Sequence, residues 1–252
     1  MRAGLHDFKS GGQPYLRVSL FVCFVVQPHR DNMTERENIF SRIREALTVE
    51  AHSHNGTGLP TTAEHRGVMP PVGTSTEEQF ALFAKNASDL KATFKRVKDA
   101  GELTAELRAL RDTEKWQRVA THKSPLAQAH AAGLGLPTLV TDDGYDKHEM
   151  EQCDVGISEC DALIAQTGSV LVTSRSAGGR ALSCLPPHHV VIARREQLVA
   201  DLPAAFALVK KTCGANYPSM ISFITGPSRT GDIERILVLG AHGPKKLTIF
   251  CL

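Results

Sequence analysis

The chain has 252 residues, of which 42% are hydrophobic and 22% charged, a composition typical of a folded protein that buries its core without disulfides or a structural metal. Its formal net charge is +2, and no run of five or six like charges occurs, so nothing indicates binding to nucleic acid or to an anionic membrane. The 6 cysteines are scattered without CxxC spacing, which favours reduced thiols in a cytoplasmic protein and argues against a disulfide framework or a self-contained iron–sulfur cluster. The histidines of residues 50–75 could bind a metal, but clustered histidines in a loop are more often incidental, and no metal site is predicted.

Residues 1–32 are predicted to be an extension outside the folded domain. Their apolar stretch from Val18 to Val26 is less than half of the about 20 residues that a membrane-spanning helix needs. It has the length of a signal-peptide core, but no small-x-small cleavage site follows it. We therefore interpret 1–32 as a non-structural or mis-started segment, and predict one domain over residues 33–252.

Helical and strand patterns alternate along the predicted domain. A capping box at Thr34 and Glu37 opens a first helix, and residues 50–75, rich in Gly, Pro, Thr and His, indicate a loop. A second cap, Thr76 with Gln79, opens another helix. The remaining expected elements are strands at 93–97, 118–121, 138–141, 155–158, 169–173, 189–193, 220–225 and 247–252, and helices at 102–110, 125–132 and 203–211. This alternation predicts an α/β fold, a mostly parallel sheet with helices on both faces.

Three segments place glycine, hydroxyl or titratable groups at the ends of predicted strands, where ligands bind in open α/β sheets. In Gln166-Thr167-Gly168-Ser169 the glycine permits close backbone approach, and the hydroxyls and N–H groups suit an anion. In Gly178-Gly179-Arg180 a flexible loop carries an arginine, which can grip a carboxylate through two parallel hydrogen bonds. His188 and His189 precede a strand, and one of them is a candidate acid or base. A tight turn, a solvated loop and a structural histidine explain the same residues without a ligand.

The fourth segment is the most specific. A buried strand is followed by the turn Gly226-Pro227-Ser228-Arg229-Thr230 and by a predicted short helix whose first turn is acidic. N–H groups at such a helix start make an anion site, with Asp232 and Glu234 as a carboxylate pair beside it. His242 follows, framed by glycines in a loop. The alternative is a helix cap with an internal Arg–carboxylate bridge, which needs no ligand.

These segments together resemble a known family. Gln166 to Ser169, Gly178 to Leu182, Pro187 to His189, Gly226 to Glu234 and Leu239 to Pro244 are similar, in order and spacing, to the LUD-domain lactate-utilisation proteins of the LutC/YkgG type. The resemblance runs from Met33 to the C-terminus, and is strong from about Cys160 onward.

The resemblance implies a domain similar to the NagB/RpiA/CoA-transferase-like superfamily. It also implies a cytoplasmic component of a three-component system that oxidises L-lactate to pyruvate, in which the other two subunits carry the iron–sulfur clusters. This chain would then be the cluster-free subunit, with no cofactor of its own and iron–sulfur proteins as partners. Gln166 stands where many relatives carry an acid, so here that position offers hydrogen bonds only.

The leading hypothesis is a subunit that binds a small carboxylate or a partner subunit. Arg180 and Arg229 are the predicted carboxylate-binding cations, with backbone N–H groups supplied by the Gly168 and Gly226 turns. The candidate proton-transfer residues are His242, His189, Asp232 and Glu234. Two alternatives stay open: an independent enzyme acting on a sugar phosphate or a CoA thioester, for which Glu159 is the acid nearest a suitable strand end, and a non-catalytic regulatory or structural partner.

Overall fold

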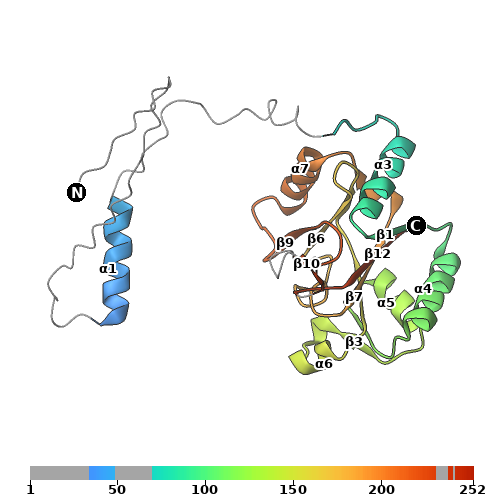
Figure 1. Ribbon diagram of the computed structural model, residues 1–252, viewed down its shortest axis with the longest axis horizontal. Coiled ribbons are helices and arrows are strands. Elements are labelled where there is room, and N and C mark those ends of the chain that lie inside the picture. The colour runs from blue at the N-terminus through green and yellow to red at the C-terminus, as the bar shows by residue number, and fades with distance from the viewer. Residues whose placement is uncertain (1–33, 49–69, 231–237, 241) are drawn as a thin grey trace, which may run out of the picture. The chain divides into compact units, whose positions relative to one another are not determined.

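A computed structural model describes residues 34–48, 70–230, 238–240 and 242–252 (Figure 1). The chain divides into two compact units, Met1–Leu59 and Pro60–Leu252, and the predicted boundary after residue 32 stays a prediction. The described part of the first unit is helix α1 (Glu35–Thr48) with its cap. The Thr34 backbone N–H donates to Glu37 Oε2 at 2.8 Å and the Glu37 N–H donates to Thr34 Oγ1 at 3.3 Å, which confirms the predicted capping box.

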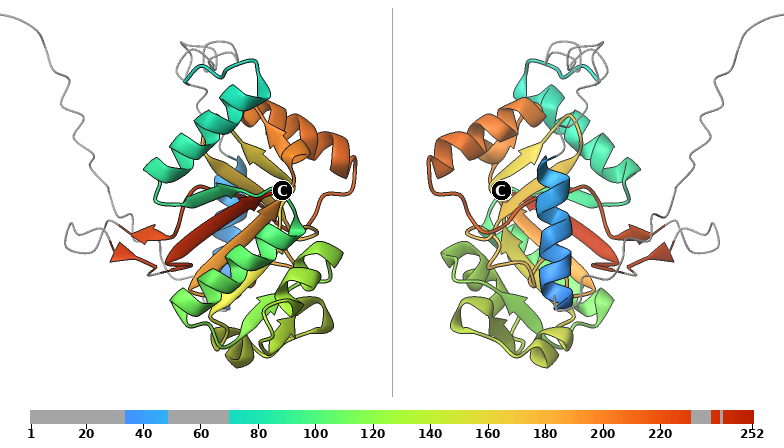
Figure 2. Two further views of the ribbon diagram at one scale, coloured as in Figure 1. Left: turned by 90° about the vertical axis from the view of Figure 1, so that its right-hand side faces the viewer. Right: turned by 90° about the vertical axis from the view of Figure 1, so that its left-hand side faces the viewer.

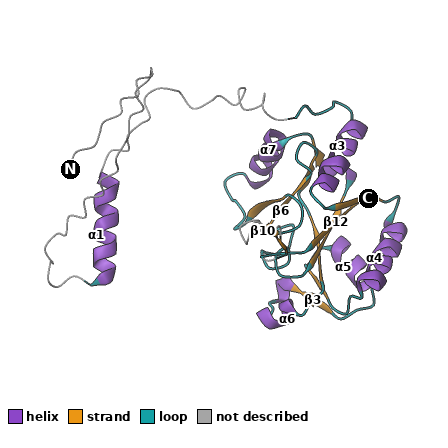
Figure 3. Cartoon of the chain, viewed as in Figure 1, coloured by secondary structure: helices purple, strands orange, loops and turns teal. Residues whose placement is uncertain are grey.

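A six-stranded, wholly parallel sheet forms the centre of the second unit (Figure 3). Its strand order is β1-β12-β7-β4-β2-β3. The strands are β1 (Thr93–Arg96), β2 (Val119–Thr121), β3 (Thr138–Val140), β4 (Val155–Glu159), β7 (His188–Ala193) and β12 (Lys246–Cys251). Strand β7 is buried along its whole length because helices and strands cover both faces of a parallel sheet.

Helices α4 (Ala100–Glu114) and α5 (Pro125–Ala132) cover one face of this sheet. Leu103 and Leu107 of α4 pack with Ala127 of α5 against Val155 and Val190 of the strands. The opposite face is covered by α3 (Thr76–Asp89), α6 (Lys147–Glu151) and a second sheet. The prediction of a mostly parallel sheet with helices on both faces is therefore confirmed.

The second sheet has four strands in the order β8-β5-β6-β9. They are β5 (Ala162–Ile164), β6 (Ser169–Thr173), β8 (Leu198–Val199) and β9 (Ile221–Ile224). One face packs against α3 and the main sheet, and helix α7 (Leu202–Cys213) packs on the other face. Figure 2 shows α3 (teal) and α7 (orange) on either side of these strands. The sequence predicts β6 and β9 but neither β5 nor β8.

One local prediction differs from the structure, and three short helices are not predicted. The cap of α3 is Ser75 with Glu78, one residue before the predicted pair, because the Glu78 N–H donates to Ser75 Oγ at 3.3 Å and Ser75 N–H donates to Glu78 Oε2 at 3.0 Å. Two short 3-10 helices, η1 (Thr141–Asp143) and η2 (Arg195–Gln197), and helix α6 are not predicted.

After the Gly226 turn the structure has a short strand pair, β10 (Arg229–Thr230) with β11 (Val238–Leu239). The predicted acidic helix, and with it Asp232 and Glu234, lies outside the described residues. Within the described parts of the chain, no helix is both long and apolar enough to cross a membrane.

Candidate functional site

The strand order has one point where the chain changes the direction in which it adds strands. After β2 the chain continues to β3, which lies on one side of β2; after β4 it continues by way of the second sheet to β7, which lies on the other side of β4. In open α/β sheets, ligands bind outside the carboxyl ends of the strands at such a switch point. A ligand site is therefore expected at the carboxyl ends of β2 and β4.

His122 and Glu159 meet at this switch point. His122 follows β2, Glu159 ends β4, and the Glu159 backbone N–H donates to His122 Nε2 at 3.2 Å. Burial lowers the pKa of His122 below its ordinary value, although the carboxylates of Asp142 and Glu159 oppose the shift. Arg194, just beyond β7, donates from Nη1 to Glu159 Oε2 at 2.9 Å. The arrangement holds a neutral imidazole beside a carboxylate that is bound to a guanidinium.

The loop that carries Gly178 and Gly179 crosses the same place. Gly178 has a φ of +59°, and a Cβ there would overlap the side chain of His122. Thr141 Oγ1, just beyond β3, donates to the Gly178 carbonyl oxygen at 3.0 Å. The glycine thus lets the loop lie directly on the carboxyl ends of the strands. Arg180 at the end of this loop is exposed and donates from Nη2 to Ser219 O at 2.6 Å.

A cavity of about 210 Å³ lies beside the segment that leaves β4. Its polar wall contains Asp161, two residues beyond the end of β4, and Arg175 from the loop after β6. Its apolar wall comes from β6 and α7. The lining residues are Cys160, Asp161, Leu171, Thr173, Arg175, Gln197, Leu208, Val209, Thr212 and Cys213.

Both charged residues of the cavity are held in place and keep bonding capacity. The Ser176 hydroxyl donates to Asp161 Oδ2 at 2.5 Å and accepts from the Thr173 backbone N–H at 2.9 Å. Arg175 donates from Nη2 to the Asn216 carbonyl at 2.8 Å. Among the ion pairs of the described residues, none contains Arg175. A guanidinium has five N–H donors, so Arg175 retains donors for an anion.

The two adjacent histidines occupy the opposite end of the sheet. His188 and His189 are the first residues of β7 and are buried. His188 Nε2 is 2.9 Å from Thr248 Oγ1, and His189 Nε2 is 2.9 Å from Ser158 Oγ. Burial lowers the pKa of His188 to about 4 and that of His189 to about 3. Both imidazoles are therefore neutral core groups, and His189 does not lie at the carboxyl edge where the sequence prediction needs it.

The Gly168 turn packs against the C-terminal part of α3. Gly168 has a φ of +65°, and a Cβ there would lie 2.6 Å from the backbone nitrogen of Ala87. Asn86 Nδ2 donates to the carbonyl oxygens of Ala165 and Gln166, both at 2.9 Å. Gln166 in turn donates from Nε2 to Pro70 O at 3.1 Å. Helix α3 thus packs onto the turn that the sequence assigns to an anion, and the Thr167 hydroxyl of this turn is buried without a hydrogen-bond partner among the described residues.

The Gly226 turn lies beside the Gly168 turn. Ser169 Oγ and Thr225 Oγ1 are 2.8 Å apart, and a Cβ on Gly226 would lie 2.7 Å from Leu90 O at the end of α3. Ser228 joins this turn to the loop before β12, because its N–H donates to Pro244 O and its carbonyl accepts from the Gly240 N–H, both at 2.9 Å.

The predicted site residues therefore fall into two groups. Gln166 to Ser169, Gly226 to Arg229 and the loop with exposed His242 lie together, and this loop leads into the amino end of β12. The Gly178–Gly179 loop lies at the carboxyl ends. The single cradle that the sequence predicts is not formed by the described residues.

Sequence reasoning did not place His122 and Asp161 in the site, considered Glu159 only for the CoA-thioester alternative, and left Arg175 out of the predicted anion-binding residues. His122, Glu159 and Arg175 share one signal, because each is the first titratable side chain after a predicted strand. The sequence prediction relied on glycine content and therefore selected glycine-rich turns instead of these strand ends. Within the described residues, no group of three or more potential metal ligands occurs.

Comparisons with known proteins agree with this fold. The sequence profile of the LUD domain matches residues 34–252. The protein named lactate utilization protein C of Shouchella clausii is 32% identical over 215 residues, which cover 77% of this chain and 92% of that protein. Its namesake in Bacillus velezensis is 25% identical over 235 residues, covering 86% and 95%.

A solved structure gives the same result for the fold alone. The crystal structure of a DUF162 family protein from Deinococcus radiodurans superposes with a TM-score of 0.54 at 21% sequence identity. The match covers 71% of this chain and 99% of that chain. At this identity the likeness supports the α/β architecture and assigns no site residue.

Proposed function

The chain belongs to the LUD-domain family, and we propose that it serves lactate utilisation by binding a small 2-hydroxy acid in the cavity between Asp161 and Arg175. One observation carries the proposal: a guanidinium without a carboxylate partner among the described residues faces the same cavity as a carboxylate. A 2-hydroxy acid has the matching groups, a carboxylate for the arginine and a hydroxyl that donates to the aspartate.

The size and the walls of the cavity suit such a ligand. Pockets for drug-sized molecules measure about 300–1,000 Å³, and this cavity, at about 210 Å³, is smaller. Leu171, Leu208 and Val209 supply an apolar surface for a methyl group or another short aliphatic group. Thr173 and Thr212 add hydroxyls that can bind further ligand oxygens.

The redox step is assigned to other subunits. In this proposal L-lactate is oxidised to pyruvate by cytoplasmic partner proteins that carry the iron–sulfur clusters, and this chain is the cluster-free component that handles the acid. That part rests on family membership. No cofactor is assigned to this chain.

A CoA-thioester enzyme is the second candidate, and one observation favours it. Glu159 stands at the carboxyl end of β4 with its side chain 14% exposed, which is the kind of strand-end position from which a glutamate can attack a thioester. Its bond to Arg194 holds one carboxylate oxygen, and the other remains available.

Calorimetric titration of the purified full-length chain distinguishes these candidates. We expect L-lactate to bind, and Arg175→Gln to weaken binding by about 1.5–3 kcal/mol, because a hydrogen bond to a charged group is lost. Arg229→Gln, a matched change on β10, should leave the affinity unchanged. Tight binding of CoA or ribose 5-phosphate without binding of lactate would replace the proposal by an enzyme of another class. Binding of none of them would favour a regulatory or structural partner.

A further inference from the structure

The two edge strands of the second sheet have different surroundings. Strand β8 lies against helix α3, which covers that edge. Strand β9 pairs with β6 on one side, and no described strand pairs with its other side. An unpaired strand edge presents a row of backbone donors and acceptors to any strand that can approach it.

The register with β6 identifies the groups on the free edge. The Ser174 N–H donates to Met220 O, which makes these two residues a hydrogen-bonded pair. In an antiparallel ladder, hydrogen-bonded residues alternate along the strand, so Ser222 also turns its N–H and C=O toward β6. Ile221 and Phe223 then direct theirs outward. The free edge of β9 thus offers two backbone N–H donors and two backbone C=O acceptors within its four residues.

The sequence around this edge has no charge. Residues 214–228 contain neither an acidic nor a basic side chain, and Pro218 and Pro227 bound the part that can extend as a strand. Edge strands that remain alone usually carry a charged residue, often lysine, that opposes pairing with another chain. No residue of β9 itself supplies this protection, and the two arginines that reach the segment, Arg175 and Arg180, donate to Asn216 O and Ser219 O ahead of the strand.

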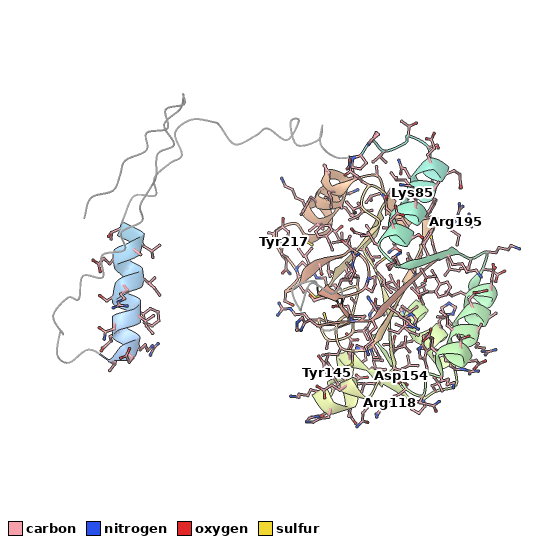
Figure 4. The ribbon with its side chains drawn as sticks, in the orientation of Figure 1. Lys85, Arg118, Tyr145, Asp154, Arg195 and Tyr217 are labelled. Carbon is pink, nitrogen blue, oxygen red and sulfur yellow. The ribbon has the colours of Figure 1, made fainter. Side chains whose placement is uncertain are left out.

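Large apolar side chains are exposed next to β9. Phe206 on α7 is 57% exposed, Tyr217 is 53% exposed and Ile221 is 37% exposed. The Phe206 ring lies 5.2 Å from the ring of Phe223, so the patch is continuous with the strand. Figure 4 shows Tyr217 at the margin of the molecule beside α7 and β9. Exposed apolar patches of this kind mark interaction surfaces.

We infer that β9 pairs antiparallel with β9 of a second copy of this chain, and that the two sheets join into one. A two-fold axis perpendicular to the sheet through Ser222 places Ile221 opposite Phe223 of the partner subunit. The outward N–H and C=O groups of these residues then form four hydrogen bonds. The same axis keeps both α7 helices on one side of the joined sheet, where Phe206 and Tyr217 of the two copies approach each other.

The absence of charged residues from β9 favours a second copy of this chain over an unrelated partner. On a two-fold axis each residue faces its own copy, so any charged side chain near the axis would face a like charge. Ser222 on the axis is neutral, and so are the other residues of β9, while Arg180 reaches the chain only at Ser219 O, before the strand begins. Binding to a different protein would not require this, because opposite charges could then pair across the interface.

Light scattering coupled to gel filtration tests the inference on the full-length chain at micromolar concentration. We expect twice the monomer mass of 27.4 kDa. Ser222→Lys, which sets like charges on the axis, and Ile221→Pro, which removes an outward N–H, should each give a monomer. Ser222→Thr and Ile221→Val are the matched controls and should remain dimers. A wild-type mass of 27.4 kDa, whether or not the protein binds another one, would overturn the inference.

Hydrogen exchange supplies a test that needs no substitution and is independent of variant folding. In the dimer the amides of Ile221 and Phe223 are bonded across the interface, so their exchange should slow at least tenfold as the protein concentration is raised through the dissociation range. The amide of Ser222, bonded to β6, should respond far less. Equal exchange of Ile221 and Phe223 at all concentrations would contradict the pairing.

Discussion

The two ends of the parallel sheet contain similar residues with different roles. Figure 4 labels Arg118, just before β2, and Arg195, just after β7, which mark the amino and the carboxyl ends. Each end gathers histidine, glycine and arginine. At the amino end the buried histidines bond to Ser158 and Thr248. At the carboxyl end, Asp161 and Arg175 face a cavity.

The difference shows that the bonding partners of a polar residue, rather than its type, decide whether it can meet a ligand. The Gly168 turn is packed against α3, where Asn86 donates to the carbonyls of Ala165 and Gln166, and its Thr167 hydroxyl is buried without a hydrogen-bond partner in the part of the chain that the structure describes. Arg175 has one bond to a backbone carbonyl and keeps further donors. A ligand site requires groups that folding has fixed in position, left partly unpaired and placed at a cavity, as Asp161 and Arg175 are and the buried Thr167 hydroxyl is not.

The largest expected effect tests the packing role of Gly168. Gly168→Ala should lower the free energy of unfolding by about 2–5 kcal/mol, of which about 1–2 comes from the left-handed backbone and about 1–3 from the clash with Ala87. Urea denaturation measures the loss. The lactate affinity of the folded fraction should not change, because the cavity lies elsewhere.

Gly179 provides the control for that experiment. Its φ is +94°, but a Cβ there would meet nothing within 4 Å, so Gly179→Ala should lower the free energy of unfolding by only about 1–2 kcal/mol. Equal losses in the two variants would mean that Gly168 is not held by contact with α3, and the comparison between the two ends would fail.

The buried histidines at the amino end should make stability depend on pH. Their pKa values in the folded state, about 4 for His188 and about 3 for His189, lie below the ordinary 6.5, so the unfolded chain binds protons first as the pH falls. Stability is therefore fully present above about pH 6.5 and is lost as the pH falls toward the folded-state values. Each histidine should remove about 2 kcal/mol between pH 7.5 and pH 5.

Denaturation of His189→Gln at the two pH values isolates one of these contributions. Glutamine keeps an amide near Ser158 but does not titrate, so the pH-dependent part should shrink by about 2 kcal/mol, whatever the stability of the variant at pH 7.5. A pH dependence as steep as that of the wild type would show that His189 is hydrated in the folded state and that the amino end is more open than the structure has it.

The smallest expected effect sharpens the role of the carboxyl end. Asp161→Asn should weaken L-lactate binding by about 1 kcal/mol, because a neutral acceptor replaces a charged one for the ligand hydroxyl. Pyruvate has an oxo group in place of the hydroxyl, so its affinity should stay the same or rise. Calorimetric titration with both acids measures the ratio, and an equal loss for both would remove the aspartate from hydroxyl recognition.

Local signals in the sequence are sufficient for most of the fold. Helix α5 begins at Pro125 and ends at Ala132 as predicted, because Ser124 caps it and glycine ends it. The parallel strands are short apolar runs that periodicity identifies. Strands β5 and β8 escape prediction because they have only three and two residues, too few for an alternation to appear.

The structure separates segments that the sequence analysis assigns to one site. The Gly178–Gly179 loop lies at the carboxyl ends of the strands as predicted, since it follows a strand that ends there. The Gly168 and Gly226 turns lie elsewhere, because β5 and β6 form a hairpin that carries Gly168 away to α3. The sequence does not reveal this hairpin, because a turn that precedes a strand has the same kinds of residues as a turn that follows one.

The amino-acid sequence by itself determined the α/β class, the order of the longer helices and strands, the capping box at Thr34 and the family. These depend on short-range hydrogen bonds, on hydrophobic periodicity and on motif spacing, all of which are readable within a few residues. Only the tertiary structure decided which polar groups keep a free donor or acceptor. That outcome depends on contacts between residues as far apart as Asn86 and Gln166, and on which edge of the sheet each loop finally reaches.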